Sequence, residues 1–583
     1  MFIATIPNRN SPPAVLLREG YREGGKVKTR TLANLSGLPP EKIEALKAAL
    51  RGEAVGTADP ILEATLPHGH VVAVTGMIQR LGLDKLLFGK RHHMRELALA
   101  LVAARVIEPG SKLSLAQSLA KGAEHHTLGE VLGLGELGKA IDPSNPNSSQ
   151  EKRAAGEFYA AMDWLLERQE KVEDALAKRH LITGCTVLYD LSSSYFEGRT
   201  CPLAKFGHSR DHREDRPQVQ YGLLCSEEGI PVAIEVVEGN TGDPKTIPAQ
   251  VAKLKERFGL QNVVVVGDRG MVTAARIRED ISTVGYDWIS ALVHKSILPL
   301  VEAKVIIPSL FDERGLAEIS HPDYPGERLI ACFNPIMAEE RARKREELLE
   351  LTEKGLQKVM DACTRKRDPL QGVAEIGLKT GAALGRFKMG RYFSIRVGEY
   401  SVGWHRKTET LAKEAAMDGI YVIRTSVAKD VMDAERAVLT YKRLAKVERA
   451  FRTMKSVDLQ VRPIFHRLED RVKAHLFICM LAYYVEWHLR QAWAELLYTD
   501  EEGSQRDTPV SPVRPSESGK LKKAKSHGKD GLPLQSFGGL MKSLATLCSS
   551  RIRLGENGPL YTRTTSPTPL QARAFELIGV AIG

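Results

Sequence analysis

The feature that most constrains the fold is the segment at residues 262–270, NVVVVGDRG, in which four consecutive valines precede a Gly-Asp-Arg-Gly turn. A strand that is apolar on both faces has to be covered on both sides, as in the middle of a sheet between two layers of helices. Residues 186–198 and 287–293 also have strand character, and residues 220–240 read as a hairpin. With helices predicted at 243–258 and 273–284, the order predicts an α/β fold with a mixed sheet and helices on both faces.

The length, net charge and cysteine content of the chain indicate how many structural units it has and what kind of protein it is. A chain of 583 residues is too long for one hydrophobic core, so three or four structural units are expected. The net charge of +11 suits a nucleic-acid partner, although many basic proteins have none. Seven cysteines without CxxC pairs favour a reducing cytoplasm over a disulfide framework or a zinc cluster.

Nothing in the sequence favours a membrane location. The N-terminus lacks the basic start and apolar run of a signal peptide. The longest apolar stretch, residues 476–485, is too short to cross a bilayer and is predicted to be a buried helix. We therefore expect a cytoplasmic protein with no membrane partner.

Changes in pattern along the chain predict seven regions. They are a basic N-terminal region with a helix after Pro40 (1–75), a helical region (76–180), the first part of the sheet domain (181–294), a segment with a charged helix and short strands (295–420), the second part of the sheet domain (421–498), a polar disordered linker (499–531) and a helical tail (532–583). Within the helical region, residues 148–180 are predicted to form one long amphipathic helix.

Two aspartates lie at strand positions where ligand-binding sites are commonly found in such sheets. Asp190 lies on the first strand, and Asp268 follows the valines at the end of theirs. The ends of strands are where ligands bind in open sheets covered by helices. Aspartate is also a common turn residue, so neither position alone identifies a site.

A third carboxylate, Glu448, lies in the basic segment at residues 441–456, YKRLAKVERAFRTMKS. At about 100° per residue, one helical face about 80° wide carries Tyr441, Leu444, Glu448, Phe451 and Lys455. On that face Glu448 is either a surface residue paired with neighbouring Lys or Arg, or a ligand of a metal ion. Three carboxylates, two from strands and one from a helix, would suit Mg²⁺ and leave room for phosphate and water.

Five blocks carry a resemblance to a known family. They are YDLSSSYF, GHSRDHREDRPQ (207–218), EVVEGNTGDPKT (235–246), VVVVGDRGM (263–271) and YKRLAKVERAFRTMK (441–455). In this order, over roughly residues 76–498, the chain resembles the DDE transposases of bacterial insertion sequences, in the group with a Tyr-Arg-Glu-Lys signature. The resemblance implies an RNase H-like domain interrupted by a β-rich insertion, with Asp190, Asp268 and Glu448 as the catalytic and metal-binding triad.

The resemblance also suggests residues that contact DNA. Tyr441 and Lys455 match the signature, but its arginine position is Leu444 here, so Arg443 and Arg452 are candidate substitutes. His208 and Arg210 lie in a polar run that family members carry near the site, although a solvated loop is the alternative. Trp404, in the insertion, would stack on an unpaired base or, alternatively, fill the core.

The predicted function follows from the resemblance. It implies a transposase that binds the terminal inverted repeats of its element. The enzyme would cut DNA with Mg²⁺ or Mn²⁺ as its cofactor, expected as two ions, and then join the freed end to target DNA. We expect a homodimer on DNA, in a bacterial cytoplasm with the nucleoid, and end recognition by the helical region at 76–180. A metal-dependent nuclease and an inactive, transposase-derived DNA-binding regulator remain alternatives.

Overall fold

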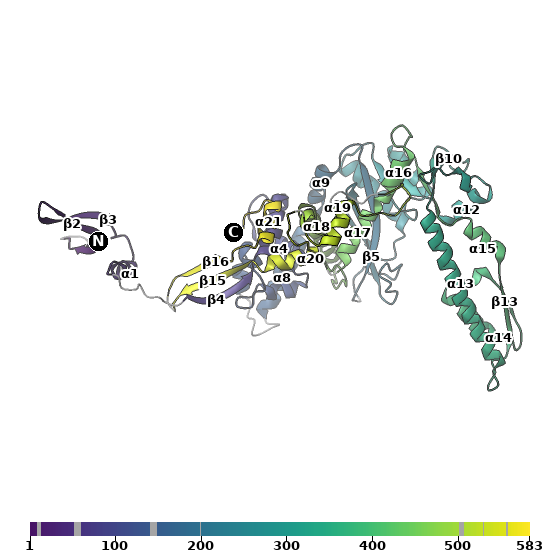
Figure 1. The fold of residues 1–583 in the computed structure, drawn as a ribbon, viewed down its shortest axis with the longest axis horizontal. Helices are drawn as coiled ribbons and strands as arrows, with labels where there is room; N and C mark the ends of the chain where they lie inside the picture. The colour runs from purple at the N-terminus through teal and green to yellow at the C-terminus, as the bar shows by residue number, and fades with distance from the viewer. Residues whose placement is uncertain are drawn as a thin grey trace. The chain divides into compact units, whose positions relative to one another are not determined.

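The computed structural model describes residues 1–8, 13–51, 60–139, 149–198, 200–456, 458–500, 506–528, 530–555 and 558–582. The chain divides into two compact units. The first contains Met1–Leu66 and Cys548–Thr565, and the second contains Pro67–Leu547 and Ser566–Gly583. Figure 1 shows the chain as a ribbon and labels many of its helices and strands.

The first unit contains two small sheets and a helix. Strands β1 (Phe2–Ile6), β2 (Ala14–Glu23) and β3 (Lys26–Asn34) form an antiparallel sheet, and α1 (Pro40–Leu50) begins at the proline after which a helix was predicted. Proline suits the first helical position because its missing N–H would have no partner there. The second sheet has the order β16-β15-β4, from Leu560–Thr564, Cys548–Leu554 and Pro60–Pro67.

The second sheet corrects the prediction of a helical tail over residues 532–583. That stretch does contain two helices, α20 (Phe537–Ala545) and α21 (Pro569–Ile578), but the hairpin β15–β16 lies between them. The hairpin completes its sheet with β4, which lies almost 500 positions earlier in the chain. Local sequence carries little signal for a partner so distant, because strand pairing depends on what lies opposite.

The second unit begins with the predicted helical region. Its helices are α2 (Gly69–Arg80), α3 (Leu83–Leu87), α4 (His93–Ile107), α5 (Lys112–Ser118), α6 (Leu128–Val131), α7 (Gly135–Lys139), α8 (Ser149–Leu166) and α9 (Gln169–His180). The single helix predicted over 148–180 is two helices, α8 and α9, with a turn at residues 167–168.

An eight-stranded mixed sheet forms the centre of this unit and confirms the predicted α/β class. Its strands are β5 (Thr186–Tyr195), β6 (Gln218–Ser226), β7 (Pro231–Glu238), β8 (Val264–Val266), β9 (Asp287–Ala291), β10 (Leu316–Ile319), β11 (Arg328–Phe333) and β14 (Ile420–Thr425), in the order β10-β11-β14-β9-β8-β5-β6-β7. Strands β5, β8 and β9 are parallel to one another, and the other neighbours are antiparallel. All four valines of residues 263–266 are buried, as their pattern predicts.

Helices cover this sheet and connect its strands. They are η1 (Asp243–Thr246), α10 (Ile247–Ala252), η2 (Lys253–Arg257), α11 (Ala274–Arg276), η3 (Ile277–Ile281), η4 (Ser282–Val284), α12 (His294–Glu302), η5 (Pro308–Leu310), α16 (Ala434–Lys442), α17 (Leu444–Lys455), α18 (Glu469–Ala492) and η7 (Ala494–Leu496). Helix α18 contains the apolar stretch at 476–485 and is buried there, as predicted. It packs against α4, α8 and β7. Among the described helices, none has the length and apolar character that a membrane crossing requires.

The segment between β11 and β14 corrects the expectation of a β-rich insertion. It consists of α13 (Pro335–Thr364), α14 (Val373–Arg386), η6 (Gly390–Tyr392), a two-stranded sheet of β12 (Phe393–Val397) and β13 (Val402–Arg406), and α15 (Thr408–Ala415). Helices α13 and α14 lie side by side (Figure 1). The Asn334 side chain caps α13, and strong helix formers fill it, so local preference alone favours a helix.

The stretch predicted to be a disordered linker, residues 499–531, is partly ordered. Its described part includes α19 (Glu517–Lys525), which the Ser516 side chain caps. Lys522 is buried, and its Nζ donates to the carbonyl of Ala494 at 2.8 Å. This tertiary contact gives a polar, lysine-rich segment a fixed position that its composition does not predict. Residues 501–505 and 529 of the predicted linker lie outside the described part.

Candidate active site

Strand pairing brings the two aspartates to the same level of the sheet. Strands β5 and β8 are parallel neighbours, with Leu188 beside Val266. Asp190 and Asp268 each lie two residues beyond this pair, at the carboxyl end of β8. Asp190 is part of the longer strand β5, whereas Asp268 lies in the exposed turn that follows the valines. The sequence pattern placed each at a strand, and the parallel pairing sets them side by side.

Glu448 reaches the same region from a helix. The segment predicted as one helix is two, α16 and α17, which meet at Arg443. The buried face of α17 includes Val447, Phe451 and Met454 and packs against β5. The Phe451 ring contacts the Tyr221 ring of β6 with 5.7 Å between the centroids. Glu448 itself is exposed.

The three carboxylates line one open cleft of about 540 Å³. The lining consists of Asp190, Leu191, Ser192, Arg210, Asp243, Asp268, Met271, Tyr441, Lys442, Leu444, Ala445, Glu448, Phe451, Arg452 and Lys455. All five residues predicted to share a helical face are among them, despite the break at Arg443. The break therefore leaves the predicted face directed into the cleft.

The three carboxylates have no ion-pair partner among the described residues. Asp190 accepts a hydrogen bond from the Leu191 backbone N–H at 2.8 Å, and Asp268 accepts one from the Tyr441 hydroxyl at 3.4 Å. Burial raises the pKa of Asp190 to about 7, and the charges of Asp268 and Glu448 add to the rise, against the opposing charge of Arg210. Within the described part of the chain, the three carboxylates therefore lie close enough to repel one another and are not neutralised by ion pairs of their own.

The three carboxylates resemble a metal site in the kind of donor that they offer. Carboxylate oxygens are the donors that Mg²⁺ and similar hard cations prefer, and none of these three forms an ion pair with a described lysine or arginine. In the arrangement of the described side chains, however, no three His, Cys, Asp or Glu residues are gathered closely enough to enclose an ion. The donors therefore fit a divalent cation in kind, and two of them, Asp268 and Glu448, are exposed and free to turn toward one.

Two further acids, Asp211 and Asp243, form ion pairs with two basic residues of the cleft lining, Lys455 and Arg210. Lys455 pairs with Asp211 at 2.9 Å, and Arg462 pairs with the same carboxylate at 2.5 Å. The Asp211 side chain is only 1% exposed, so it is a fixed anchor for both cations. Burial lowers the pKa of Lys455, and the charge of Asp211 opposes that change.

Asp243 anchors Arg210 in the same way, at 2.7 Å. It also accepts a hydrogen bond from the Gln220 amide at 2.8 Å. Sequence reasoning treated Asp243 only as a helix start and did not single out Asp211. Their position in the sequence could have identified them, because Asp211 lies in the motif block at residues 207–218 and Asp243 in the block at 235–246.

The other predicted DNA contacts fall in different places. Arg452 is exposed on the cleft lining. Arg443 pairs with Glu227 away from the lining, and His208 is an exposed loop residue. Trp404, on β13, is partly buried and packs against two hydrophobic clusters of the insertion.

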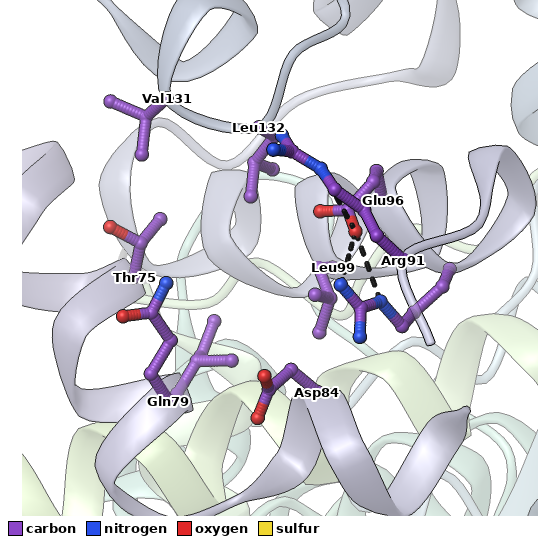
Figure 2. Close-up of a pocket in the computed structure, with 10 residues that line it drawn as sticks. Thr75, Gln79, Asp84, Arg91, Glu96, Leu99, Val131 and Leu132 are labelled. Atoms are coloured by element: carbon purple, nitrogen blue, oxygen red, sulfur yellow. Dashed lines mark hydrogen bonds and ion pairs between the residues drawn. The ribbon is translucent and has the colours of Figure 1, made fainter. Parts of the chain in front are cut away.

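A second cavity lies in the helical region and differs in character (Figure 2). Its volume is about 130 Å³, and its polar lining includes Asp84, Arg91, Arg95 and Glu96. Glu96 pairs with Arg95 at 2.6 Å and with Arg91 at 3.7 Å, the contacts drawn as dashed lines. Because these charges neutralise one another, we regard the carboxylate cleft as the candidate active site.

Two family models match parts of the chain. A family model described as "Transposase DDE domain" matches residues 196–485, which include Asp268 and Glu448. A second, described as "IS1634 family transposase, N-terminal domain", matches residues 3–60. No curated protein matches the chain. DDE domains occur in polynucleotidyl transferases that act on DNA and depend on divalent metal ions. The chain belongs to the DDE-type transposases of insertion sequences.

Proposed function

We propose that this transposase binds the terminal inverted repeats of its own element and carries out DNA cleavage and strand transfer in the cleft of Asp190, Asp268 and Glu448. One observation carries the proposal. Carboxylates from β5, from the end of β8 and from α17 line one cleft and form no ion pair among the described residues, whereas Arg452 and Lys455 lie beside them. A divalent cation would offset the repulsion among the carboxylates, and the basic residues would attract a phosphate.

Asp190, Asp268 and Glu448 would hold the divalent metal, Mg²⁺ or Mn²⁺, as two ions. When bound, the metal activates the attacking oxygen and neutralises the leaving oxygen of an in-line displacement. Asp190 is the fixed ligand of the set because β5 holds it and the Leu191 N–H orients one of its oxygens. Tyr441 orients Asp268 through its hydroxyl.

The basic residues position the DNA. Phosphoryl transfer depends on alignment and charge stabilisation more than on covalent help from the protein. Arg452 is exposed on the lining and meets the incoming phosphate, whereas Lys455 is held in place by Asp211. The same cleft then serves two steps, attack by water at the element end and attack by the freed 3′-OH on target DNA.

We further infer an RNase H-like catalytic domain formed by residues 181–294 and 421–498. Of residues 295–420, the strands β10 and β11 join the central sheet, and the segment between β11 and β14 forms the insertion. A homodimer brings two element ends together, since both ends have to join target DNA in concert. The helical region at 76–180 contributes to end recognition, and the protein works in the bacterial cytoplasm at the nucleoid.

The decisive experiment is cleavage and strand transfer on labelled DNA that carries the element's own ends, with Mg²⁺ or Mn²⁺, for the wild type and Glu448→Gln. Metal-dependent joining by the wild type alone is the expected result. Cleavage without joining would favour the metal-dependent nuclease. End binding without chemistry in either protein would favour the inactive DNA-binding regulator.

A further inference from the structure

The active-site cleft continues into two further cavities. The first, of about 360 Å³, shares Asp268, Tyr441 and Lys442 with the cleft. The second, of about 630 Å³, shares His294 and Arg341 with the first. Together the three form one trench, which runs from the carboxylates past α12 to the N-terminal half of α13 and to η6. We call it the active-site trench.

The far end of the trench is rich in basic residues. Its lining includes His294, Arg341, Lys344, Arg345, Lys388 and Arg391. Both acids of this lining are already paired, Glu414 with Arg391 at 3.1 Å and Asp418 with Arg345. This leaves Arg341, Lys344 and Lys388 exposed, without an ion-pair partner among the described residues.

The helical repeat of α13 directs these charges to one side. Arg341, Lys344 and Leu348 follow the spacing of residues that share a helical face, and all three line the trench. From Arg341 to Lys344, the two basic residues of this row, the helix axis advances about 4.5 Å. One strand of duplex DNA carries a phosphate about every 3.4 Å along its axis, so the spacing of these two charges suits neighbouring phosphates.

The middle of the trench has a different surface. Leu292, Ile297, Ile420 and Met337 line it, beside Arg269 at the edge nearest the carboxylates. An apolar floor between basic walls suits a nucleic-acid strand, whose sugars and base edges are less polar than its phosphates. A free inorganic anion would gain nothing from such a floor.

We propose that the active-site trench holds the backbone of one DNA strand on its way from the reacting phosphate to the insertion, with phosphate contacts from Arg341, Lys344 and Lys388. This inference rests on the proposed function, because it assumes that DNA binds in the active-site cleft. It gives the insertion a role in alignment, because phosphate contacts fix the register of DNA but carry no sequence information.

A salt titration of DNA binding tests the contacts. The trench variant Arg341→Gln/Lys344→Gln/Lys388→Gln is compared with Arg343→Gln/Lys354→Gln/Lys358→Gln, which removes as many charges from exposed positions of α13 outside the trench. Binding of labelled end DNA is measured in EDTA over a range of salt concentrations. Three lost phosphate contacts lower the slope of log K against log salt by about 2–3, and the control variant changes it by less than about 1. Equal changes in the two variants would overturn the proposal.

Neutral backbone substitutions locate the strand. Single methylphosphonates, placed in turn on either side of the cleavage position, remove one phosphate charge each. At a contacted position the substitution weakens binding by the wild type and has little effect on the trench variant. Equal weakening of both proteins at every position would contradict the proposal. Because binding is measured without metal, a missing cleavage reaction would count against the proposed function alone, and complete absence of DNA binding would overturn both.

Discussion

At the scale of single residues, the cleft contains two kinds of acid. Among the described residues, Asp190, Asp268 and Glu448 lack cationic partners, whereas Asp211 and Asp243 each form an ion pair with a basic residue. The Asp211 side chain is buried between Lys455 and Arg462, and Asp243 lines the cleft but is paired with Arg210. The unpaired acids are available to a ligand, and the paired acids are part of the structure.

The raised pKa of Asp190 predicts a pH effect on stability. Folding raises this pKa from its ordinary value to about 7. The folded state therefore binds the proton more tightly than the unfolded state, and stability falls as pH rises through that interval. Asp190→Asn is expected to stabilise the metal-free protein at pH 8 by about 1–2 kcal/mol, after allowance for solvent in the open cleft.

Thermal unfolding at pH 5 and pH 8, with and without Mg²⁺, checks this expectation. Mg²⁺ raises the Tm of the wild type at pH 8 and has little effect on Asp190→Asn. A lower Tm for the variant than for the wild type at pH 8 would contradict the assigned burial and repulsion.

The Asp211 anchor predicts a large loss of stability. Asp211→Ala leaves Lys455 and Arg462 without their buried partner, and breaking one side of a buried pair costs about 3–5 kcal/mol. Asp215→Ala is a matched control four positions along the chain, because Asp215 pairs with Arg213 at the exposed surface. Urea unfolding should separate the two, with a midpoint for the control close to that of the wild type.

At the scale of elements, the loop after α17 is held by a cluster of buried basic groups. Lys112 lies 3.2 Å from His466 Nε2 and 3.4 Å from His475 Nδ1, and His475 Nε2 contacts the Val461 carbonyl at 3.0 Å. Arg105 lies in the same cluster and donates to the carbonyl of Leu459. Among the described contacts of this cluster there is no carboxylate to pair with a charged imidazole. The two histidines are therefore neutral in the folded state.

This cluster predicts acid sensitivity. Burial lowers the pKa of His466 to about 3 and that of His475 well below its ordinary value, and the charges of Lys112 and Arg105 add to both effects. The unfolded chain binds these protons more readily, so stability is lost as pH falls from about 6.5 toward 3. His475→Gln should flatten the loss of Tm over this interval. His208→Gln, at an exposed position, should leave the pH profile as in the wild type, and identical profiles for both variants would refute the assignment.

At the scale of the whole molecule, the two ends of the second unit's sequence share one core. Helix α21 packs against α2 and α18, and Trp493 of the loop after α18 donates from its indole N–H to the Ala574 carbonyl at 2.9 Å. Phe575 of α21 is 2% exposed. The last helix therefore belongs to the folding unit that begins at Pro67.

A paired substitution in α21 tests this. Phe575→Ala removes a buried ring and is expected to cost about 3–5 kcal/mol. Glu576→Ala, next to it and exposed, should cost less than about 0.5 kcal/mol. Chemical denaturation followed by circular dichroism measures both. An unchanged midpoint for Phe575→Ala would show that the core does not depend on α21.

The sequence alone determined the local character of most elements. Four consecutive valines required a buried strand, and the spacing of Tyr441, Glu448 and Lys455 indicated a shared face that the structure directs into one cleft. Strong helix formers also predicted the charged helix that became α13. These inferences hold because they depend on side-chain periodicity and on preferences of a few neighbouring residues.

Only the tertiary structure decided which distant segments meet. The parallel pairing of β5 with β8 sets Asp190 beside Asp268, the sheet of β4 with β15 joins the two ends of the chain, and buried Lys522 fixes a segment with the composition of a linker. Each of these contacts is formed between segments that are far apart in the sequence, so a local sequence pattern does not predict it. The ion pairs of Asp211 and the continuation of the cleft into the trench also join residues that are distant in sequence, so the sequence alone did not predict them.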